Sequence, residues 1–401
     1  MTASLYLHIP FCASLCDYCD FYSIAVNETP YTLIDSFIDA LLADIKDQFA
    51  FFHVDHVPSV YIGGGTPSAL GAECTERLLS GLQALLKHTG KAPDEFTIEA
   101  NPESADEDFL RACVKGGVSR ISLGVQTFHE PSRRAVHRAG DGNLLDERLS
   151  LASSCFPDAF SVDLITGLPF QTAAVLREDI ERILAFRPAH VSLYSLILEP
   201  ETPLGKQAAL SAAVGKAAGR AALALPRGDE ADHLWITGRD MLEKAGLFQY
   251  EVSNFALPHK TCAHNIRYWR MENWLGAGPA ASGTIIDDAD GSGKRFSYPA
   301  DINAYLAMPQ PRIRSARIEE LNQADLMRES LLMGFRYRAG PDPLMFRRRF
   351  GCSIEDCIPQ TITRWLARGF FETAQNGNLT PSREGLLFLN AFLRDAFAEL
   401  D

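Results

Sequence analysis

The stretch HIPFCASLCDYCDF, residues 8–21, carries three cysteines at the spacing Cys12-x3-Cys16-x2-Cys19. It directly follows the β-rich run SLYLHI from Ser4, so the cysteines lie in a loop at the end of a predicted strand. Clustered cysteines in a cytosolic chain more often bind metal than form disulfides. A cube of four irons normally takes four thiolates, so three cysteines predict a [4Fe-4S] cluster with one iron open to another ligand.

A zinc site is the main alternative, because the three thiolates and His8 together would supply four suitable ligands. Cysteines that only pack in the core are a third interpretation. Tyr18, the aromatic residue before Cys19, favours the cluster. For the other six cysteines we expect buried structural thiols; these are Cys74, Cys113, Cys155, Cys262, Cys352 and Cys357.

Outward from the cysteine loop, short β-rich runs alternate with longer helical patterns as far as about Val252. The expected strands are SLYLHI from Ser4, VPSVYI from Val57, FTIEA from Phe96, RISLGV from Arg120, FSVDLI from Phe160 and VSLYSLIL from Val191. The expected helices cover 31–49, 73–88, 105–115, 144–154, 172–186 and 229–245. Six βα units predict an α/β fold, a partial (β/α)6 TIM-like barrel with a parallel sheet.

The alternation stops after about Pro311. Helices are expected over 321–335, 344–350, 358–368 and 383–398, with a short β-wing over 370–379. We therefore predict two domains, a barrel over 1–310 and a mostly helical, winged-helix-like domain over 311–401. The Ala- and Gly-rich segment from Pro203 to Arg227 is interpreted as a small helix plus a loop insertion, whose role the sequence does not indicate.

Composition excludes several classes of protein. The 401 residues are 46% hydrophobic and carry a formal net charge of −13, which disfavours nucleic acid as a partner. The basic run Arg347 to Arg349 is typical of a solvated helix face. No run of about 18 apolar residues and no signal peptide is visible, so we expect a cytoplasmic protein without stable membrane insertion.

Polar or glycine-rich residues follow the predicted strands. In such barrels the residues past the strand C-termini converge on one face and carry function. Gly63 to Pro67 form a turn whose backbone amides can approach a ligand, although a tight strand-to-helix turn explains it equally well. Arg138 offers a fork donor for a carboxylate. Further polar groups, for which ordinary loop capping is the alternative, are Glu99, Gln126 and Asp163.

On these motifs the chain resembles the radical S-adenosylmethionine (SAM) superfamily, whose Cx3CxΦC loop (Φ aromatic) holds a [4Fe-4S] cluster that binds SAM. Within it, the chain is similar to the oxygen-independent coproporphyrinogen III oxidase group and its haem chaperone subgroup. The resemblance rests on LYLHIPFCxxxCxYC, YIGGGTPS, ISLGVQTF, VDLITGLPFQT, QYEVSNFA, HNxxYW and LLMGFRYRAG, and spans nearly the whole chain. It implies SAM contacts at Tyr6, Gly64, Gly65, Thr66, Glu99, Gln126, Arg138 and Asp163, and cluster ligation by Cys12, Cys16 and Cys19.

Three features favour the chaperone subgroup. The oxidases of the group have a further cysteine two residues after the last cluster cysteine, where this chain has Phe21, and a long extension before the loop. The stretch CAHNIRYW matches the HNxxYW motif of the chaperones, which implies that His264 binds haem. Imidazole is a common ligand of haem iron. A structural histidine beside core aromatic residues is the alternative.

The sequence thus predicts a protein that binds haem and transfers it to an acceptor protein, with a cluster and SAM supporting the transfer and no catalytic residue assigned. Oxidative decarboxylation of coproporphyrinogen III is the alternative, and radical chemistry on another substrate is a third. The expected partners are haem and an unidentified acceptor protein, and the sequence leaves open whether the chain forms a homodimer.

Overall fold

A twelve-stranded sheet dominates the computed structural model, which describes residues 1–214, 224–226, 228–375 and 377–400. Its central strands pair in the order β1-β4-β5-β6-β7-β8 and are all parallel, as the sequence predicts. Their bounds are β1 Ser4–Ile9, β4 Ser59–Gly64, β5 Glu95–Ala100, β6 Arg120–Gln126, β7 Phe160–Thr166 and β8 His190–Ser195. The predicted last strand was too long: it ends at Ser195, and Ile197 beyond it is 69% exposed.

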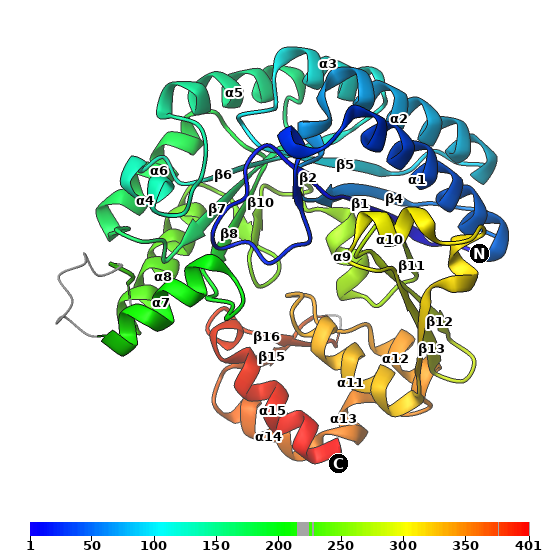
Figure 1. Cartoon of the computed structure of the whole chain (residues 1–401). Helices are drawn as coiled ribbons and strands as arrows, with labels where there is room; N and C mark the ends of the chain where they lie inside the picture. The colour runs from blue at the N-terminus through cyan, green and yellow to red at the C-terminus, as the bar shows by residue number, and fades with distance from the viewer. Residues whose placement is uncertain (215–223, 227, 376, 401) are drawn as a thin grey trace.

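Helices cover the outer face of this sheet and form the arc at the top of Figure 1. Asp106, Asp141 and Thr172 cap three of them by accepting hydrogen bonds from backbone N–H groups of the first turn. The helices are α1 Tyr31–Phe51, α2 Gly71–Leu86, α3 Glu107–Lys115, α4 Glu130–Ala135, α5 Gly142–Cys155, α6 Ala173–Ala185 and α8 Asp229–Lys244. The predicted helices are therefore present, with ends that differ by a few residues.

The predicted insertion from Pro203 to Arg227 begins with helix α7 Pro203–Val214. Residues 215–223 and 227 of that segment lie outside the described residues. Within the described part of the chain, no helix is long and apolar enough to cross a membrane.

The sheet extends beyond both sides of the predicted barrel. β11 Trp274–Ala277 runs parallel to β1, and it continues into the antiparallel strands β12 Ser282–Asp287, β13 Ser292–Ser297 and β14 Arg317–Leu321. At the other edge, β10 Asn254–Ala256 pairs antiparallel with β8, and β9 Phe248–Gln249 pairs antiparallel with β10. The sequence did not predict these strands: β9, β10 and β11 are short, β14 is mostly exposed and polar, and β12 and β13 mix buried and half-buried positions without regular alternation. The linking helices are α9 Ala263–Trp269 and α10 Ile302–Ala307.

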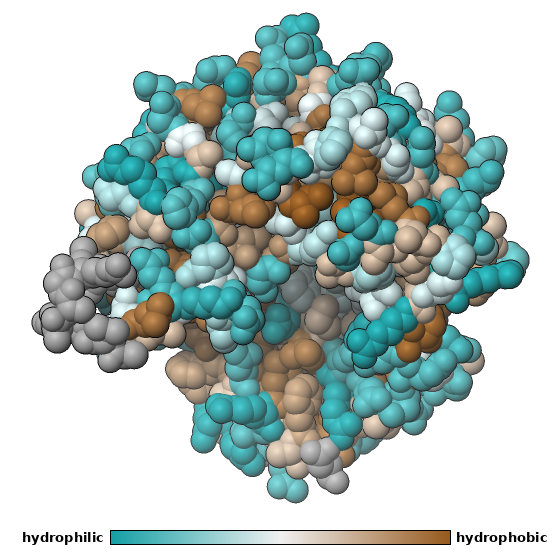
Figure 2. All heavy atoms as spheres, in the orientation of Figure 1, coloured by the Kyte–Doolittle hydropathy of each residue, from teal (hydrophilic) through white to brown (hydrophobic). Residues whose placement is uncertain are grey.

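The C-terminal part is mostly helical with a small hairpin, as predicted. Its elements are α11 Gln323–Gly334, α12 Pro343–Phe350, α13 Ile354–Cys357, α14 Pro359–Ala367, β15 Phe371–Thr373, β16 Leu379–Pro381 and α15 Leu389–Leu400. A second hydrophobic core forms here around Phe335, Phe371 and Phe392, whose ring centroids lie 4.0 to 5.5 Å apart. The domain boundary at residue 310 stays a prediction. Figure 2 shows a hollow between this part and the sheet.

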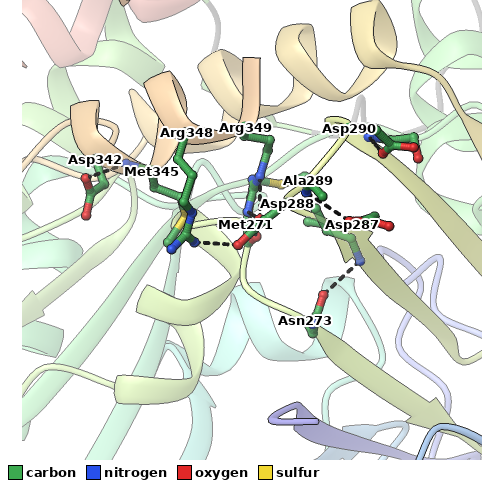
Figure 3. Close-up of polar contacts among 12 residues, drawn as sticks. Met271, Asn273, Asp287, Asp288, Ala289, Asp290, Asp342, Met345, Arg348 and Arg349 are labelled. Atoms are coloured by element: carbon green, nitrogen blue, oxygen red, sulfur yellow. Dashed lines mark hydrogen bonds and ion pairs between the residues drawn. The ribbon is translucent and has the colours of Figure 1, made fainter. Parts of the chain in front are cut away.

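Helix α12 is tied to the sheet by a buried arginine (Figure 3). Arg349 donates from Nε (3.0 Å) and Nη2 (2.8 Å) to Oδ1 of Asp288, in the turn after β12, and from Nη2 to the carbonyl of Met271 (3.3 Å). Arg348 also contacts Asp288. The Arg349 side chain is only 5% exposed. The prediction of a solvated face for the basic run is therefore wrong at Arg349, because the turn supplies its counter-charge.

Replacing Asp288 by Ala should lower the free energy of unfolding by about 2 kcal/mol, because it leaves a buried guanidinium without its carboxylate. Asp290→Ala is the matched control, since Asp290 lies in the same turn, is exposed and contacts neither arginine. Its loss should stay within about 0.5 kcal/mol. Urea unfolding of both variants measures the difference. Equal losses would mean that the turn, rather than the ion pair, stabilises the contact.

Candidate cluster and cofactor site

A cavity of about 510 Å³ lies at the C-terminal ends of the parallel strands. It brings together most of the residues that the sequence analysis singled out: Cys12, Cys16, Cys19, Gly64, Gly65, Thr66, Glu99, Gln126, Arg138 and Asp163. Two of the predicted site residues, Tyr6 and His264, do not line it. The rule that functional residues follow the C-terminal ends of the strands therefore predicted that these residues, which are far apart in sequence, lie close together.

The glycine turn after β4 holds the cysteine loop in place. Gly65 donates its N–H to the carbonyl of Ile9 (2.8 Å), and Thr66 donates to the carbonyl of Phe11 (2.7 Å). A Cβ on Gly65 would lie 2.9 Å from that Phe11 oxygen and 3.1 Å from Sγ of Cys12. The turn therefore needs glycine here for close contact with the loop itself.

Gly64 is required for a different reason. Its φ is +110°, and a Cβ there would lie 2.7 Å from Nδ1 of His8. Both the backbone conformation and the imidazole exclude a larger residue. The loop is further fixed by the short parallel pair β2 Phe11–Cys12 and β3 Ile24–Ala25.

The thiols of the loop lie in polar contact with the cavity wall. Thr66 Oγ1 is 3.4 Å from Sγ of Cys12, and Nη1 of Arg138 is 3.6 Å from Sγ of Cys16. Burial raises the pKa of Cys12, and it raises the pKa of Cys19 to about 11. Without a metal the thiols of Cys12 and Cys19 are therefore protonated at neutral pH, and iron binding would displace their protons.

His8 is poorly placed to complete a zinc site. Its Nε2 pairs with the carbonyl of Tyr22 (2.9 Å) and its Nδ1 with the hydroxyl of Tyr6 (3.2 Å). Both ring nitrogens are thus engaged within the protein. Among the described residues, no three His, Cys, Asp or Glu side chains are arranged to hold a single metal ion. Three thiols spread over a loop suit a cluster, in which each binds a different iron.

Two buried carboxyl groups line the cavity. Glu99 accepts a hydrogen bond from the hydroxyl of Tyr61 (2.6 Å), and its pKa is raised to about 7 by burial and, less, by the charge of Asp163. Asp163 accepts from Oγ of Ser122 at 3.1 and 3.2 Å, and burial raises its pKa too. Near neutral pH Glu99 can therefore either donate or accept a hydrogen bond toward the cavity.

Arg138 is held by the protein on both of its Nη atoms. Nη2 donates to Oδ1 of Asn101 (2.7 Å) and contacts the carbonyl of Gly124. Asn101 in turn donates from Nδ2 to Oγ1 of Thr66 (2.8 Å). A chain of hydrogen bonds therefore links the guanidinium beside Cys16 to the hydroxyl beside Cys12.

Sequence analysis missed Asn101, Ser122 and Tyr194, which also line the cavity. Asn101 directly follows the last residue of β5, where the strand-end rule should have included it. Ser122 lies two positions before Gly124 on β6 and shares its side of the strand by alternation.

Unpaired polar atoms make the cavity suitable for a polar cofactor. Oε1 of Gln126 and Nε of Arg138 are buried without a hydrogen-bond partner. Gln126 also has a φ of +69°, beside a register shift between β6 and β7. Such strained backbone and unsatisfied groups concentrate at ligand sites. The residues therefore fit an iron-sulfur cluster with a polar ligand such as SAM.

The two predicted residues that miss the cavity belong to the interior below it. Tyr6 stacks on Tyr61, with ring centroids 6.3 Å apart. His264 is 1% exposed, and its Nδ1 lies 2.9 Å from Oγ of Ser59, the first residue of β4. Its Nε2 is buried without a partner, and burial lowers its pKa to about 3. His264 is therefore a neutral imidazole at the end of the sheet opposite the cysteine loop.

Helix α9, which carries His264, is capped by a side chain of the sheet. The carboxylate of Glu95, the first residue of β5, accepts hydrogen bonds from the backbone N–H groups of Ala263 and His264, both at 2.9 Å. Sγ of Cys262 lies 3.2 Å from the same carboxylate. These contacts hold α9 closed over the N-terminal ends of β4 and β5.

Three comparisons place the chain among known proteins. The family model of the Radical SAM superfamily matches residues 6–183. The protein named Heme chaperone HemW of Lactococcus lactis is 33% identical over 90% of this chain and 88% of its own length, and that of Escherichia coli K12 is 31% identical over 99% and 98%. The solved structure of the radical SAM enzyme coproporphyrinogen III oxidase (HemN) from Escherichia coli superimposes with a TM-score of 0.79 at 22% identity, covering 100% of this chain and 90% of that one.

The structural match confirms the fold, and the full-length relatives are similar enough to assign the family. The chain belongs to the radical SAM superfamily and, within it, to the HemW subgroup.

Proposed function

We propose that this chain is a cytoplasmic haem chaperone, which binds haem and transfers it to an acceptor protein. The observation that carries the proposal is the similarity over nearly the whole chain to proteins named Heme chaperone HemW. The match to the oxidase supports a shared fold only. Phe21 supports the same choice, since it occupies the place of the oxidases' additional cysteine and is 65% exposed at the cavity mouth.

Membership of the superfamily implies a [4Fe-4S] cluster and SAM, which together supply one-electron chemistry when bound. Cys12, Cys16 and Cys19 would hold the cluster. SAM would lie against the remaining cavity residues Gly64, Gly65, Thr66, Glu99, Gln126, Arg138 and Asp163. Tyr6 would support Tyr61 from below the cavity rather than touch SAM.

Within this cavity, side chains of the protein would bind SAM and orient it. The unpaired Oε1 of Gln126 would accept a hydrogen bond from SAM, and the unpaired Nε of Arg138 would donate one. The carboxyl group of Glu99, with a pKa of about 7, would bind a hydroxyl group without adding a full buried charge.

Haem binding by His264 needs a change in the structure. An imidazole that is 1% exposed cannot reach haem iron while α9 is closed. Its Nε2, however, has no partner to lose, and the low pKa keeps the ring neutral, so that one ring nitrogen has a lone pair for the metal. We therefore propose that α9 moves away from Glu95 and Ser59 when haem binds.

Cys16→Ala should abolish the cluster, because it removes one of only three protein ligands. After anaerobic reconstitution with iron and sulfide, we expect the variant to lose the broad absorbance near about 400 nm that thiolate-bound iron gives. The matched control is Cys155→Ala, a half-buried cysteine outside the loop, which should keep full iron and sulfide. Full cluster content in Cys16→Ala would refute the assignment.

His264→Ala should weaken haem binding by at least about tenfold, because it removes the imidazole that would bind the haem iron. Absorbance titration with haem measures this, and transfer from the loaded wild type to a haem-free b-type cytochrome tests delivery. His233→Ala, at an exposed histidine, is the control. Unchanged binding would place haem elsewhere. Formation of protoporphyrinogen IX from coproporphyrinogen III, SAM and reductant would instead support the oxidase.

Glu95→Gln should speed haem binding about fivefold, because a neutral cap holds α9 more weakly by about 1 kcal/mol. The same change should slightly lower the melting temperature. Stopped-flow mixing with haem measures the rate, and Glu107→Gln, at an exposed position of the first turn of α3, is the control. An unchanged rate in Glu95→Gln would mean that haem binds without opening α9.

A further inference from the structure

Two cysteines outside the cluster loop lie side by side in the C-terminal part. The Sγ atoms of Cys352 and Cys357 are 2.9 Å apart, and both side chains are half-buried. The expectation of buried structural thiols holds for Cys74, Cys113 and Cys262, whereas this pair and Cys155 are only half-buried. The pair is therefore accessible to small reagents and already in position to react together.

The local backbone brings the two thiols together. Gly351 ends α12 in the left-handed conformation, with a φ of +74°, and reverses the chain just before Cys352. Ser353 and Asp356 then form a capping box at the start of α13, with backbone-to-side-chain hydrogen bonds of 3.1 and 3.2 Å. Because the turn is ordered by these contacts, little further conformational entropy is lost when the two sulfurs are joined.

We propose that Cys352 and Cys357 form a thiol–disulfide exchange site whose substrate is a small disulfide such as glutathione disulfide. One cysteine thiolate attacks a sulfur of the small disulfide, which breaks its S–S bond and releases one small thiol. The second cysteine then attacks the mixed disulfide and releases the other. The two protein thiols are oxidised to a disulfide, the small disulfide is reduced to two thiols, and the two protons pass to those products.

The site is close to the contact that ties the C-terminal helices to the sheet. Cys352 lies three residues after Arg349, which is bound to Asp288 and Met271 (Figure 3). A disulfide would join the end of α12 to the end of α13 and restrict the unfolded chain. The oxidised protein should therefore be more stable to unfolding than the reduced one.

The sequence allows a direct measurement. Trypsin cleaves after Arg349 and Arg364, so both cysteines fall in the single peptide FGCSIEDCIPQTITR, residues 350–364. The cluster-loaded protein, in which the loop cysteines are protected, is equilibrated anaerobically with graded ratios of glutathione disulfide to glutathione, then alkylated and digested. As the ratio rises, this peptide should lose two hydrogens and stop taking up the alkylating reagent.

Two comparisons make the outcome specific. Cys352→Ser leaves Cys357 alone, so its peptide should carry a bound glutathione instead of an internal disulfide. In the wild type, Cys155 is half-buried but should form no intramolecular disulfide. The melting temperature of the wild type should rise by a few degrees on oxidation. The proposal is overturned if the wild-type peptide keeps two alkylated cysteines in glutathione disulfide alone, or if it gains only glutathione.

Discussion

Two backbone hydrogen bonds, from Gly65 to Ile9 and from Thr66 to Phe11, are the contacts on which the candidate site depends. They join the turn after β4 to the cysteine loop after β1, and they form only because no side chain stands between the two backbones. Through Thr66 and Asn101 the same contact continues to Arg138 beside Cys16. The position of the thiols is thus set by main-chain packing between neighbouring strand ends, which a single added Cβ would disrupt.

Much of this arrangement could be predicted from the sequence. The six parallel strands have strong apolar runs and regular spacing, so β1 and β4 to β8 could be predicted. The cysteines and the polar residues at the strand ends line one cavity. The strands β11 to β14 were missed because their side chains alternate weakly: β14 is exposed at four of its five residues. Their pairing follows from the neighbouring strand edge, a tertiary cause that no local pattern records.

The motif around His264 shows a different limit. Residue types alone indicate either a metal ligand or a packed core histidine, and in the structure His264 has features of both. Its ring packs against aromatic side chains, and its Nδ1 forms a hydrogen bond with Ser59. Its Nε2 has no hydrogen-bond partner. The cap from Glu95, which is 169 residues away in sequence, shows how α9 is held. Such a contact between distant residues cannot be read from spacing.

The closed position of α9 also affects how tightly the protein can bind haem. If α9 must leave Glu95 before His264 can bind haem, then the free energy of closing that helix is subtracted from the affinity for haem. The same closure favours departure of the haem, because the helix regains its hydrogen bonds as the ligand leaves. A binding site that recloses on its own suits a carrier, whose task is complete only when its cargo has been given up.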